Sequence, residues 1–274
     1  MNLCREKALR RKRKKKADVE DSKLPLTEHL AELRKRLLVS VAVVFVAFLV
    51  VFNFSENLFT MLTFPLRSEF RLHLKQPFLE LIHKAPPPLA FFAVGEAFWM
   101  HLKISFVAAT VVSLPVIFYE LWMFVSPGLL KKEKKFVLPF VVSATILFLI
   151  GAFFCFFIVL PFALTFLLGY KTADLTAMLS IEKYMDFCLK FVLAFGVVFE
   201  LPLIILFLAR FNIITPQFLA KHRKYAILFA FIIAAVLTPT PDAFNQTLMA
   251  VPVIILYEIG ILVARVVLRR RDNA

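Results

Sequence analysis

The sequence predicts an all-α membrane protein that crosses the bilayer six times. Two observations support this fold class: the composition and the spacing of the apolar runs. Hydrophobic residues make up 61% of the 274 residues, and 33 residues are Phe. Soluble proteins hold roughly 45–50% apolar residues, because a soluble domain has too little interior for more. The bilayer is therefore the expected solvent for most of the chain, and a soluble globular fold is excluded.

The predicted spans follow from length. A transmembrane helix needs about 20 mostly apolar residues, because the hydrocarbon core is ~30 Å thick and each residue rises ~1.5 Å. We expect the first apolar run to be a retained anchor, because it is long for a signal peptide and no A-x-A-like cleavage site follows it. The six predicted spans are 37–54, 104–125, 136–160, 187–209, 225–239 and 244–264.

Two of these spans are unusual. The third apolar run continues to about Leu168, and we expect Pro161 to end or bend its tail. The fifth is short, with an uninterrupted apolar stretch only from Tyr225 to Leu237. Two interpretations of the fifth span stay open. It thins the bilayer locally or needs partners, or Thr238 and its neighbours extend the helix to normal length.

The distribution of positive charge orients the predicted bundle. The chain has 33 Lys and Arg against 19 Asp and Glu, a net charge of +14. With a cytoplasmic N-terminus, the segments on that side hold 25 of the 33 basic residues, as expected if positive charge is retained in the cytoplasm. We therefore expect both termini to be cytoplasmic.

Two basic tails flank the expected membrane domain, which covers residues 26–268. We expect residues 1–25 to be a disordered cytoplasmic tail that helps orientation and attracts anionic lipid, and residues 269–274 to be a short basic tail. Nucleic acid is not an expected partner, because no stacking aromatic residues interrupt the basic run at 5–16.

The sequence carries no pattern that indicates catalysis or a cofactor. The three cysteines, Cys4, Cys155 and Cys188, form no C-x-x-C pair, so neither a disulfide framework nor a metal site is expected. The common nucleotide-binding, metalloprotease and serine-hydrolase motifs are absent. No loop between the spans is long enough for a catalytic domain. We expect neither an enzyme nor a bound cofactor or metal.

Carboxylates inside spans are costly, so they are functional candidates by default. Glu200 lies in the middle of the fourth predicted span, Glu258 in the sixth, and Glu120 near the end of the second. For Glu200 two interpretations stay open. It is a polar contact for a partner helix or a protonatable relay, or it is a protonated acid satisfied by a neighbouring helix. Glu120 is close enough to the interface to be satisfied by its neighbours.

The segment 26–37 predicts an amphipathic helix that lies on the inner membrane surface and leads into the first span. Its leucines recur on one helical face, and its other face is charged. Glu32 stands there beside Arg34 and Arg36. The simpler interpretation of Glu32 is an ion pair with Lys35 or Arg36; the alternative is an acceptor for a cationic ligand.

A second isolated carboxylate follows the same pattern. Glu133 stands alone in the lysine run KKEKK at 131–135. Carboxylates form bidentate, charge-assisted hydrogen bonds with guanidinium groups. Glu32 and Glu133, on two segments of the same membrane side, could therefore receive two arginines.

Six stretches in order carry a resemblance to a known family. They are HLAELRKRL at 29–37, FPL at 64–66, EAF before Lys103, LPVIFYELWMFVSPGLLKKEKK at 114–135, FGVVFELP at 195–202 and TPTPDAFNQTLMAVP at 238–252. From about Leu26 to Leu268 the chain resembles the TatC family of Sec-independent, twin-arginine export components. The turn TPTPD departs from the TPPD of other members, which leaves the register of the residues after it less certain. The basic tail is also longer than the family leads us to expect.

The resemblance implies a fold and an activity. It implies six helices in a concave, glove-like bundle in a bacterial inner membrane. It implies a receptor for the twin-arginine signal peptides of folded precursors, in a translocase driven by the proton-motive force. The implied partners are TatB- and TatA-type single-span proteins, membrane lipids and further copies of the chain.

The resemblance also implies the roles of particular residues. Glu32 and Glu133 would help to receive the arginine pair, and Arg34, Phe124 and Pro127 match other emphasised positions. Glu200 would be a polar feature of the concave face. Thr238 and Gln246, with Asp242 in the same turn, would form a polar site where a partner helix docks.

One alternative belongs to a different class of function. A proton-coupled secondary transporter of a small solute could use Glu200 and Glu258. Against this alternative, the sequence shows neither a convincing inverted repeat nor a pair of Gly-interrupted helices.

Overall fold

The computed structural model describes residues 26–72, 79–83, 89–125, 137–169, 178–211, 213–238 and 242–272. The chain divides into two compact units. The N-terminal unit contains residues 1–47 and 109–142, and the C-terminal unit contains residues 48–108 and 143–274. The predicted tail before residue 26 lies outside the described residues.

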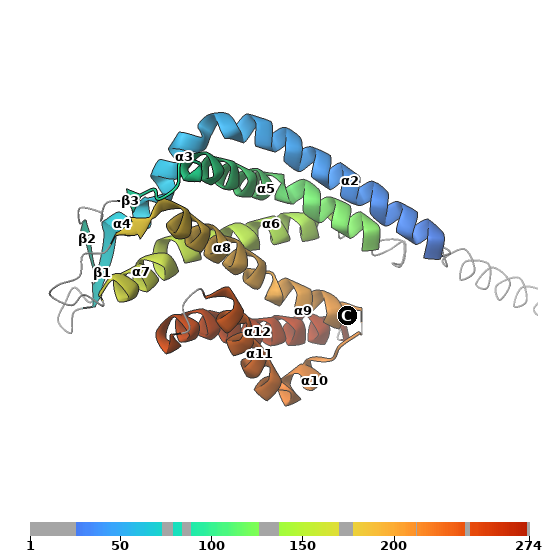
Figure 1. Ribbon diagram of the computed structural model, residues 1–274. Helices are drawn as coiled ribbons and strands as arrows, with labels where there is room; N and C mark the ends of the chain where they lie inside the picture. Colours follow the sequence, from blue (N-terminus) through green and yellow to red (C-terminus); the bar gives the residue numbers. More distant parts are fainter. Residues whose placement is uncertain are drawn as a thin grey trace, which may run out of the picture. The chain divides into compact units, whose positions relative to one another are not determined.

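The described chain is almost entirely helical, as predicted (Figure 1). Its α-helices are α2 (Leu26–Val51), α3 (Ser55–Leu62), α4 (Phe64–Arg67), α5 (Glu96–Val125), α6 (Val137–Phe154), α7 (Leu160–Gly169), α8 (Ile181–Phe199), α9 (Leu201–Arg210), α10 (Pro216–Lys221), α11 (Arg223–Leu237) and α12 (Ala243–Asp272).

Four short strands are the part of the fold that the all-helical prediction did not contain. β1 (Ser68–Leu72) and β2 (Leu79–His83) pair in antiparallel register, with Ser68 opposite His83. β3 (Leu89–Ala90) and β4 (Leu179–Ser180) pair in parallel over two residues. All four lie in the C-terminal unit, outside the predicted spans.

Five helical stretches of the described chain are long and apolar enough to cross a membrane. They are Glu28–Arg67, Glu96–Val125, Val137–Gly169, Ile181–Arg210 and Ala243–Arg269. Each contains one predicted span. The remaining predicted span corresponds to α11, whose 15 residues cover about 22 Å at ~1.5 Å per residue.

The fifth predicted span is therefore short, and its expected extension through Thr238 is wrong. α11 ends at Leu237, and Thr238 has extended backbone angles of φ −74° and ψ 126°. The cause is local: the next residue is Pro239, and the ring of a proline disfavours the helical conformation of the residue before it.

Of the two effects expected of Pro161, an end or a bend of the third span, the structure excludes the end. A π-helical turn, Cys155–Val159, joins α6 to α7, and the helix continues to Gly169. Proline lacks an N–H group and crowds the turn that precedes it. The wider turn at this place accommodates both effects, as π-turns do inside otherwise regular helices.

The segment 26–37 is helical as predicted, but it does not form a separate surface helix. It is the first half of α2, which runs on to Val51 without interruption. Its side chains contact α5 within the N-terminal unit: the rings of His29 and Phe124 stack with centroids 4.4 Å apart.

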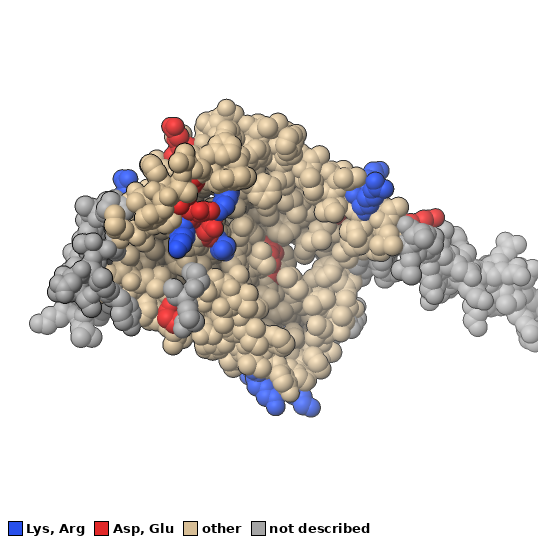
Figure 2. Space-filling view, in the orientation of Figure 1, with Lys and Arg blue, Asp and Glu red and all other residues tan. Residues whose placement is uncertain are grey.

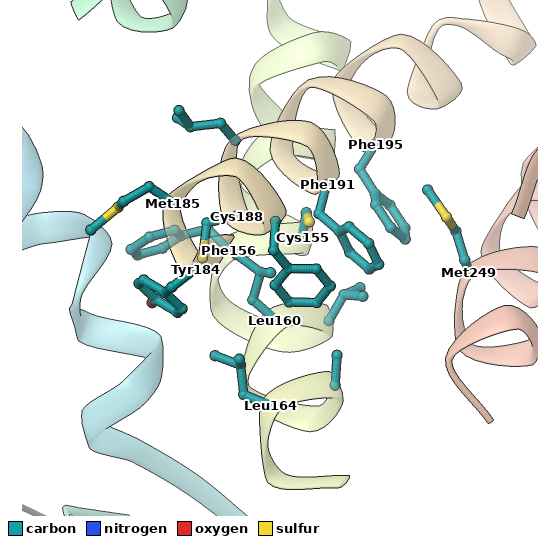
Figure 3. Close-up of a cluster of buried hydrophobic side chains, with 14 of the residues drawn as sticks. Cys155, Phe156, Leu160, Leu164, Tyr184, Met185, Cys188, Phe191, Phe195 and Met249 are labelled. Carbon is teal, nitrogen blue, oxygen red and sulfur yellow. The ribbon is translucent and has the colours of Figure 1, made fainter. Parts of the chain in front are cut away.

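The core of the C-terminal unit forms where α7, α8 and α12 meet (Figure 3). Phe191 and Phe195 on α8 are 1% and 0% exposed, and they point toward α12 and Met249. Cys155 and Cys188 are buried there as free thiols, where they pack as small apolar side chains.

Two glycines allow α6 and α8 to approach each other closely. A Cβ atom at Gly196 would lie 2.4 Å from Cζ of Phe148, and one at Gly151 would lie 2.6 Å from the carbonyl oxygen of Phe195. Small residues at helix crossings are the usual means of close packing in membranes, where burial from water supplies little attraction. This crossing determines where the end of α8 lies, one turn after Gly196.

Polar contacts hold the other end of α8. The hydroxyl of Tyr184 donates a hydrogen bond of 2.6 Å to the carbonyl of Leu62. Nζ of Lys103 lies 2.8 Å from Oε1 of Glu182 and 3.0 Å from Oδ1 of Asp186. Charged side chains gather at only a few places on the visible face of the molecule, which is otherwise uncharged (Figure 2).

Candidate functional site

The predicted arginine-receiving residues fall on two helices of the N-terminal unit. Glu32 and Arg34 lie on α2, and Phe124 lies on the last turn of α5. The other two predicted members, Pro127 and Glu133, lie outside the described residues. The structure therefore describes one half of the predicted site.

An arginine of the chain lies between two carboxylates at this place. Nη2 of Arg36 is 3.3 Å from Oε1 of Glu32, and Nη1 is 3.0 Å from Oε2 of Glu120. Glu32 and Arg36 are four residues apart on α2, so they lie on the same helical face. Of the two ion-pair partners expected for Glu32, the structure selects Arg36, and Lys35 is exposed.

The three groups differ in exposure. The side chains of Arg36 and Glu32 are 24% and 25% exposed, and that of Glu120 is 10% exposed. Sequence reasoning expected Glu120 to be satisfied by its neighbours, which is confirmed. It did not identify Arg36 as the partner, because the two residues are 84 positions apart and no local pattern links them.

An aromatic contact about one turn away from this ion-pair cluster also joins α2 and α5. His29 and Phe124 stack with an interplanar angle of 16°. Phe124 follows Glu120 by one turn of α5, and His29 precedes Glu32 by almost one turn of α2. One face of each helix therefore contributes both contacts. His29 was not singled out from the sequence, although its place in the H-x-x-E-x-x-x-R pattern would have put it on the face of Glu32.

Arg34 differs from Arg36. Its side chain is exposed, and it forms no ion pair with a residue that the structure describes. Glu32 and Arg34 point to different faces of α2, because residues two positions apart do not face each other on a helix. An exposed cation and a partly accessible carboxylate thus lie close in sequence but on separate faces.

Glu200, the intramembrane candidate, lies at a break between two helices. It ends α8 and precedes α9, and its N–H donates to the carbonyl of Val197 over 3.1 Å. Pro202 explains the break, because it offers no N–H to the carbonyl four residues earlier. The helix restarts at once, since the N–H of Ile204 donates to the carbonyl of Glu200 over 2.9 Å.

The side chain of Glu200 is buried but incompletely bonded. The residue is 7% exposed, and its Oε1 has no hydrogen-bond partner among the described residues. An unpaired polar atom away from water is costly. Both interpretations of Glu200 therefore stay predictions, and the described residues leave one of its two oxygens without a partner.

Glu258 differs from Glu200, which weakens the transporter alternative. It accepts from Arg223 at both oxygens, with Nε–Oε1 at 2.7 Å and Nη2–Oε2 at 2.8 Å. Its side chain is 38% exposed. Glu258 is therefore an exposed ion-pair partner and not the second buried intramembrane acid that the transporter alternative invokes.

The three predicted docking residues lie together at the turn between α11 and α12, and the structure shows what each bonds. The hydroxyl of Thr238 donates to the carbonyl of Ala234 over 2.8 Å. The amide of Gln246 donates to the carbonyl of Phe231 over 3.1 Å, which joins α12 to α11. Asp242 caps α12, where its Oδ1 accepts from the N–H of Asn245 over 2.7 Å.

Asn245 is a polar residue of this turn that sequence reasoning missed. It is 1% exposed, and Nδ2 donates to Oδ2 of Asp242 over 3.0 Å. Its Oδ1 has no partner among the residues described. The D-x-x-N spacing at the start of a helix is the sequence signal that could have found it. The α11–α12 turn and the α8–α9 break thus each bury one unpaired oxygen.

Comparison with known proteins gives concordant matches. The family model "Sec-independent protein translocase protein (TatC)" matches residues 28–252. The protein of that name from Desulforapulum autotrophicum is 44% identical over 254 residues, which are 93% of this chain and 89% of that protein. The one from Aquifex aeolicus is 38% identical over 252 residues, 91% of this chain and 98% of that protein.

A solved structure is similar over the same range. The crystal structure described as the twin-arginine translocase receptor TatC superimposes with a TM-score of 0.72 at 36% sequence identity. The match covers 87% of this chain and 98% of the crystallised chain.

Proposed function

The chain belongs to the TatC family of Sec-independent protein translocase components, and from that membership we propose that it is the receptor for twin-arginine signal peptides. As a member of this family with several apolar helices, it is a multi-pass membrane protein and a component of a protein translocase. The precursors would be folded proteins, and transport would use the proton-motive force.

The observation that best supports the receptor proposal is that Glu32 binds a guanidinium group in the structure. Arg36 supplies that group over 3.3 Å. Glu32 is one-quarter exposed, so an arginine of a signal peptide can reach the same carboxylate from solvent. Hydrogen bonds between carboxylate and guanidinium groups are short, charge-assisted and selective for a planar donor.

The remaining predicted residues would complete the receptor site. Phe124 lies beside Glu120 on the same face of α5 and would pack against the signal peptide. Arg34 offers an exposed cation. Glu133 would supply a second carboxylate for the second arginine, and Pro127 would belong to the same site. The site would lie on the cytoplasmic side of a bacterial inner membrane, with six spans and both termini cytoplasmic, as the distribution of basic residues favours.

Two polar sites of the C-terminal unit would bind partner proteins. The unpaired Oε1 of Glu200 and the turn carrying Thr238, Asp242 and Gln246 each lie in an apolar setting. The single-span helix of a TatB- or TatA-type protein could supply polar side chains there. Membrane lipids and further copies of the chain would complete the assembly.

A binding experiment tests the receptor proposal. The protein in nanodiscs is titrated with a fluorescent peptide that carries an Arg-Arg pair before an apolar segment, and with the same peptide carrying Lys-Lys. We expect Lys-Lys to bind at least about tenfold more weakly, because an ammonium group lacks the planar fork. The variants Glu32→Gln and Glu133→Gln should lose the same preference.

The matched control is Glu28→Gln, an exposed carboxylate one turn earlier on α2. This variant should bind like the wild type. Equal binding of both peptides, unmoved by the substitutions at positions 32 and 133, would contradict the proposal.

A further inference from the structure

We propose that Glu120 is a further residue of the arginine-recognition site: it holds Arg36 when the guanidinium of a signal peptide takes Glu32. This inference rests on the proposed receptor function. Glu120 would be a positioning residue, because it acts on the ligand through Arg36.

The two ion-pair contacts of Arg36 differ in length and in exposure. This difference indicates which contact an incoming guanidinium group replaces. The bond to Glu120 is 3.0 Å long, and the bond to Glu32 is 3.3 Å long. Glu120 is also the less exposed partner, at 10% against 25%. Charge-assisted hydrogen bonds strengthen as they shorten and as water is excluded. The bond to Glu32 is therefore the weaker of the two and the one that solvent reaches.

The net charge of the cluster of Glu32, Arg36 and Glu120 favours the binding of one more cation. Two carboxylates and one guanidinium carry a net charge of −1 when all three are ionised. A single incoming guanidinium neutralises that charge and gives one cation to each carboxylate. Glu32 would then bind the signal peptide while Arg36 stays on Glu120. Without Glu120, Arg36 could find its anion only at Glu32, and it would compete with the ligand for that group.

The aromatic contact keeps Arg36 within reach of Glu120. The stacked rings of His29 and Phe124 join α2 to α5 about two turns before Arg36. The hydroxyl of Ser40 donates to the carbonyl of Arg36 over 3.1 Å, one turn after it. Arg36 can therefore release one carboxylate without leaving the other.

The same geometry explains a preference for arginine. An incoming side chain must replace a guanidinium nitrogen at Glu32. Another guanidinium restores that hydrogen bond in the same plane, whereas a lysine offers a compact and strongly hydrated charge. A lysine of the peptide would therefore displace Arg36 from Glu32 less readily than an arginine does.

The test measures binding of the Arg-Arg peptide to the full chain in nanodiscs for four variants. Glu120→Gln should weaken binding by about tenfold, because Arg36 then occupies Glu32 alone. Arg36→Gln combined with Glu120→Gln should restore binding to within about twofold of the wild type, or exceed it, because Glu32 then has no internal competitor. Glu28→Gln is the control, and Glu32→Gln is the reference for loss of the site.

The free energy of unfolding of each variant is measured beside its binding, because removing both members of an ion pair can also restore stability that removing one costs. Weaker binding by Glu120→Gln under conditions where it is fully folded, with recovery in the double variant, supports the positioning role. Binding by the double variant as weak as that of Glu120→Gln would mean that Arg36 does not compete for Glu32. That result, or wild-type binding by Glu120→Gln, would overturn the inference. Where Glu120→Gln fails to fold, Glu120→Asp replaces it. The shorter side chain weakens the contact with Arg36, so this variant should bind the peptide more weakly than the wild type, and wild-type binding would overturn the inference.

The experiment also separates this inference from the receptor proposal. Unchanged binding by Glu32→Gln would reject Glu32 as an arginine acceptor, and both proposals would fail at this site. Loss of binding in Glu32→Gln, with no effect of Glu120→Gln, would retain the receptor and reject only the role of Glu120.

Discussion

The carboxylates of the two units differ in whether they have a partner. In the N-terminal unit, Glu32 and Glu120 share Arg36, and Glu32 lies within reach of solvent. In the C-terminal unit, Glu200 is buried at a helix break, and one of its oxygens is unpaired among the described residues. A ligand at the first site must displace a bond that exists. A ligand at the second site would supply a bond that is missing, so the two sites should respond in opposite ways to the loss of charge.

The largest expected effect is at the first site. Arg36→Gln leaves Glu120 mostly buried without a cation, and uncompensated charges of this kind are strongly destabilising. We expect the free energy of unfolding to fall by about 2–3 kcal/mol, measured by unfolding in mixed detergent micelles. Arg34→Gln, which removes an exposed cation from the same helix, is the control and should change it by less than about 0.5 kcal/mol. Equal losses of stability in the two variants would contradict the distinction between Arg36, which has two ion-pair partners, and Arg34, which has none among the described residues.

The next effect concerns the helix that carries Glu200. Gly196→Ala places a methyl group 2.4 Å from Cζ of Phe148, so α6 and α8 or the ring must shift. Overpacking of this kind lowers the free energy of unfolding by about 1–3 kcal/mol. Binding of the Arg-Arg peptide should stay at the wild-type level, since the site lies in the other unit. Gly169→Ala is the control, because nothing lies within 4 Å of its added Cβ. A loss of peptide binding in Gly196→Ala would show that the two sites are not independent.

A smaller effect on stability is expected at Glu200, which has no ion-pair partner among the described residues, than at the carboxylates that share Arg36. Glu200→Gln keeps the shape of the side chain and removes an acidic group for which no described residue supplies an ion-pair partner. The free energy of unfolding should rise or stay within about 0.5 kcal/mol of the wild type, measured in the same micelles. Copurification of a tagged single-span TatB-type partner should fall in this variant. A stability loss as large as that of Arg36→Gln would mean that Glu200 is bonded after all.

The smallest effect belongs to the exposed ion pair. Arg223→Gln separates Glu258 from its cation, but the two side chains are 51% and 38% exposed. Water can replace the lost partner, so the free energy of unfolding should fall by less than about 1 kcal/mol. The double-mutant cycle with Glu258→Gln measures the coupling directly. Coupling as strong as that between Arg36 and Glu120 would mean that exposure does not explain the difference between the two pairs.

The helices could be predicted from sequence because their signals are local. Apolar runs identified the five helical stretches of the described chain that are long and apolar enough to cross a membrane. Prolines explain three irregularities, through their missing N–H groups or their crowded rings. Pro202 follows the break at Glu200, Pro161 follows the π-turn, and Pro239 follows the end of α11. The prediction placed the end of the fifth span two residues too late. For Pro161 it left an end or a bend of the helix open, because proline limits a helix in several ways and the surrounding turn decides which one is adopted.

The candidate site could be predicted only in part, because its central contact is long-range. The spacing of Glu32 and Arg36 indicated their pairing, since four residues form one helical turn. The approach of Glu120 to Arg36 depends on how α2 and α5 pack, and no spacing in one helix encodes it. For the same reason, the sequence identified both Glu200 and Glu258 as carboxylates inside spans but could not show that Arg223 pairs with only the second of them.

The π-turn at Cys155–Val159 determines which side of the helix the residues after it occupy. It contains one residue more than an α-helical turn would, and the helix continues through it without a break. Deleting the half-exposed Phe157 would turn this stretch into ordinary α-helix and rotate everything after it by about 100°. Leu160, Ala163 and Leu164, which are 0%, 0% and 5% exposed, would then face away from the core. One surplus residue thus sets which side of α7 faces the protein and which side faces the lipid.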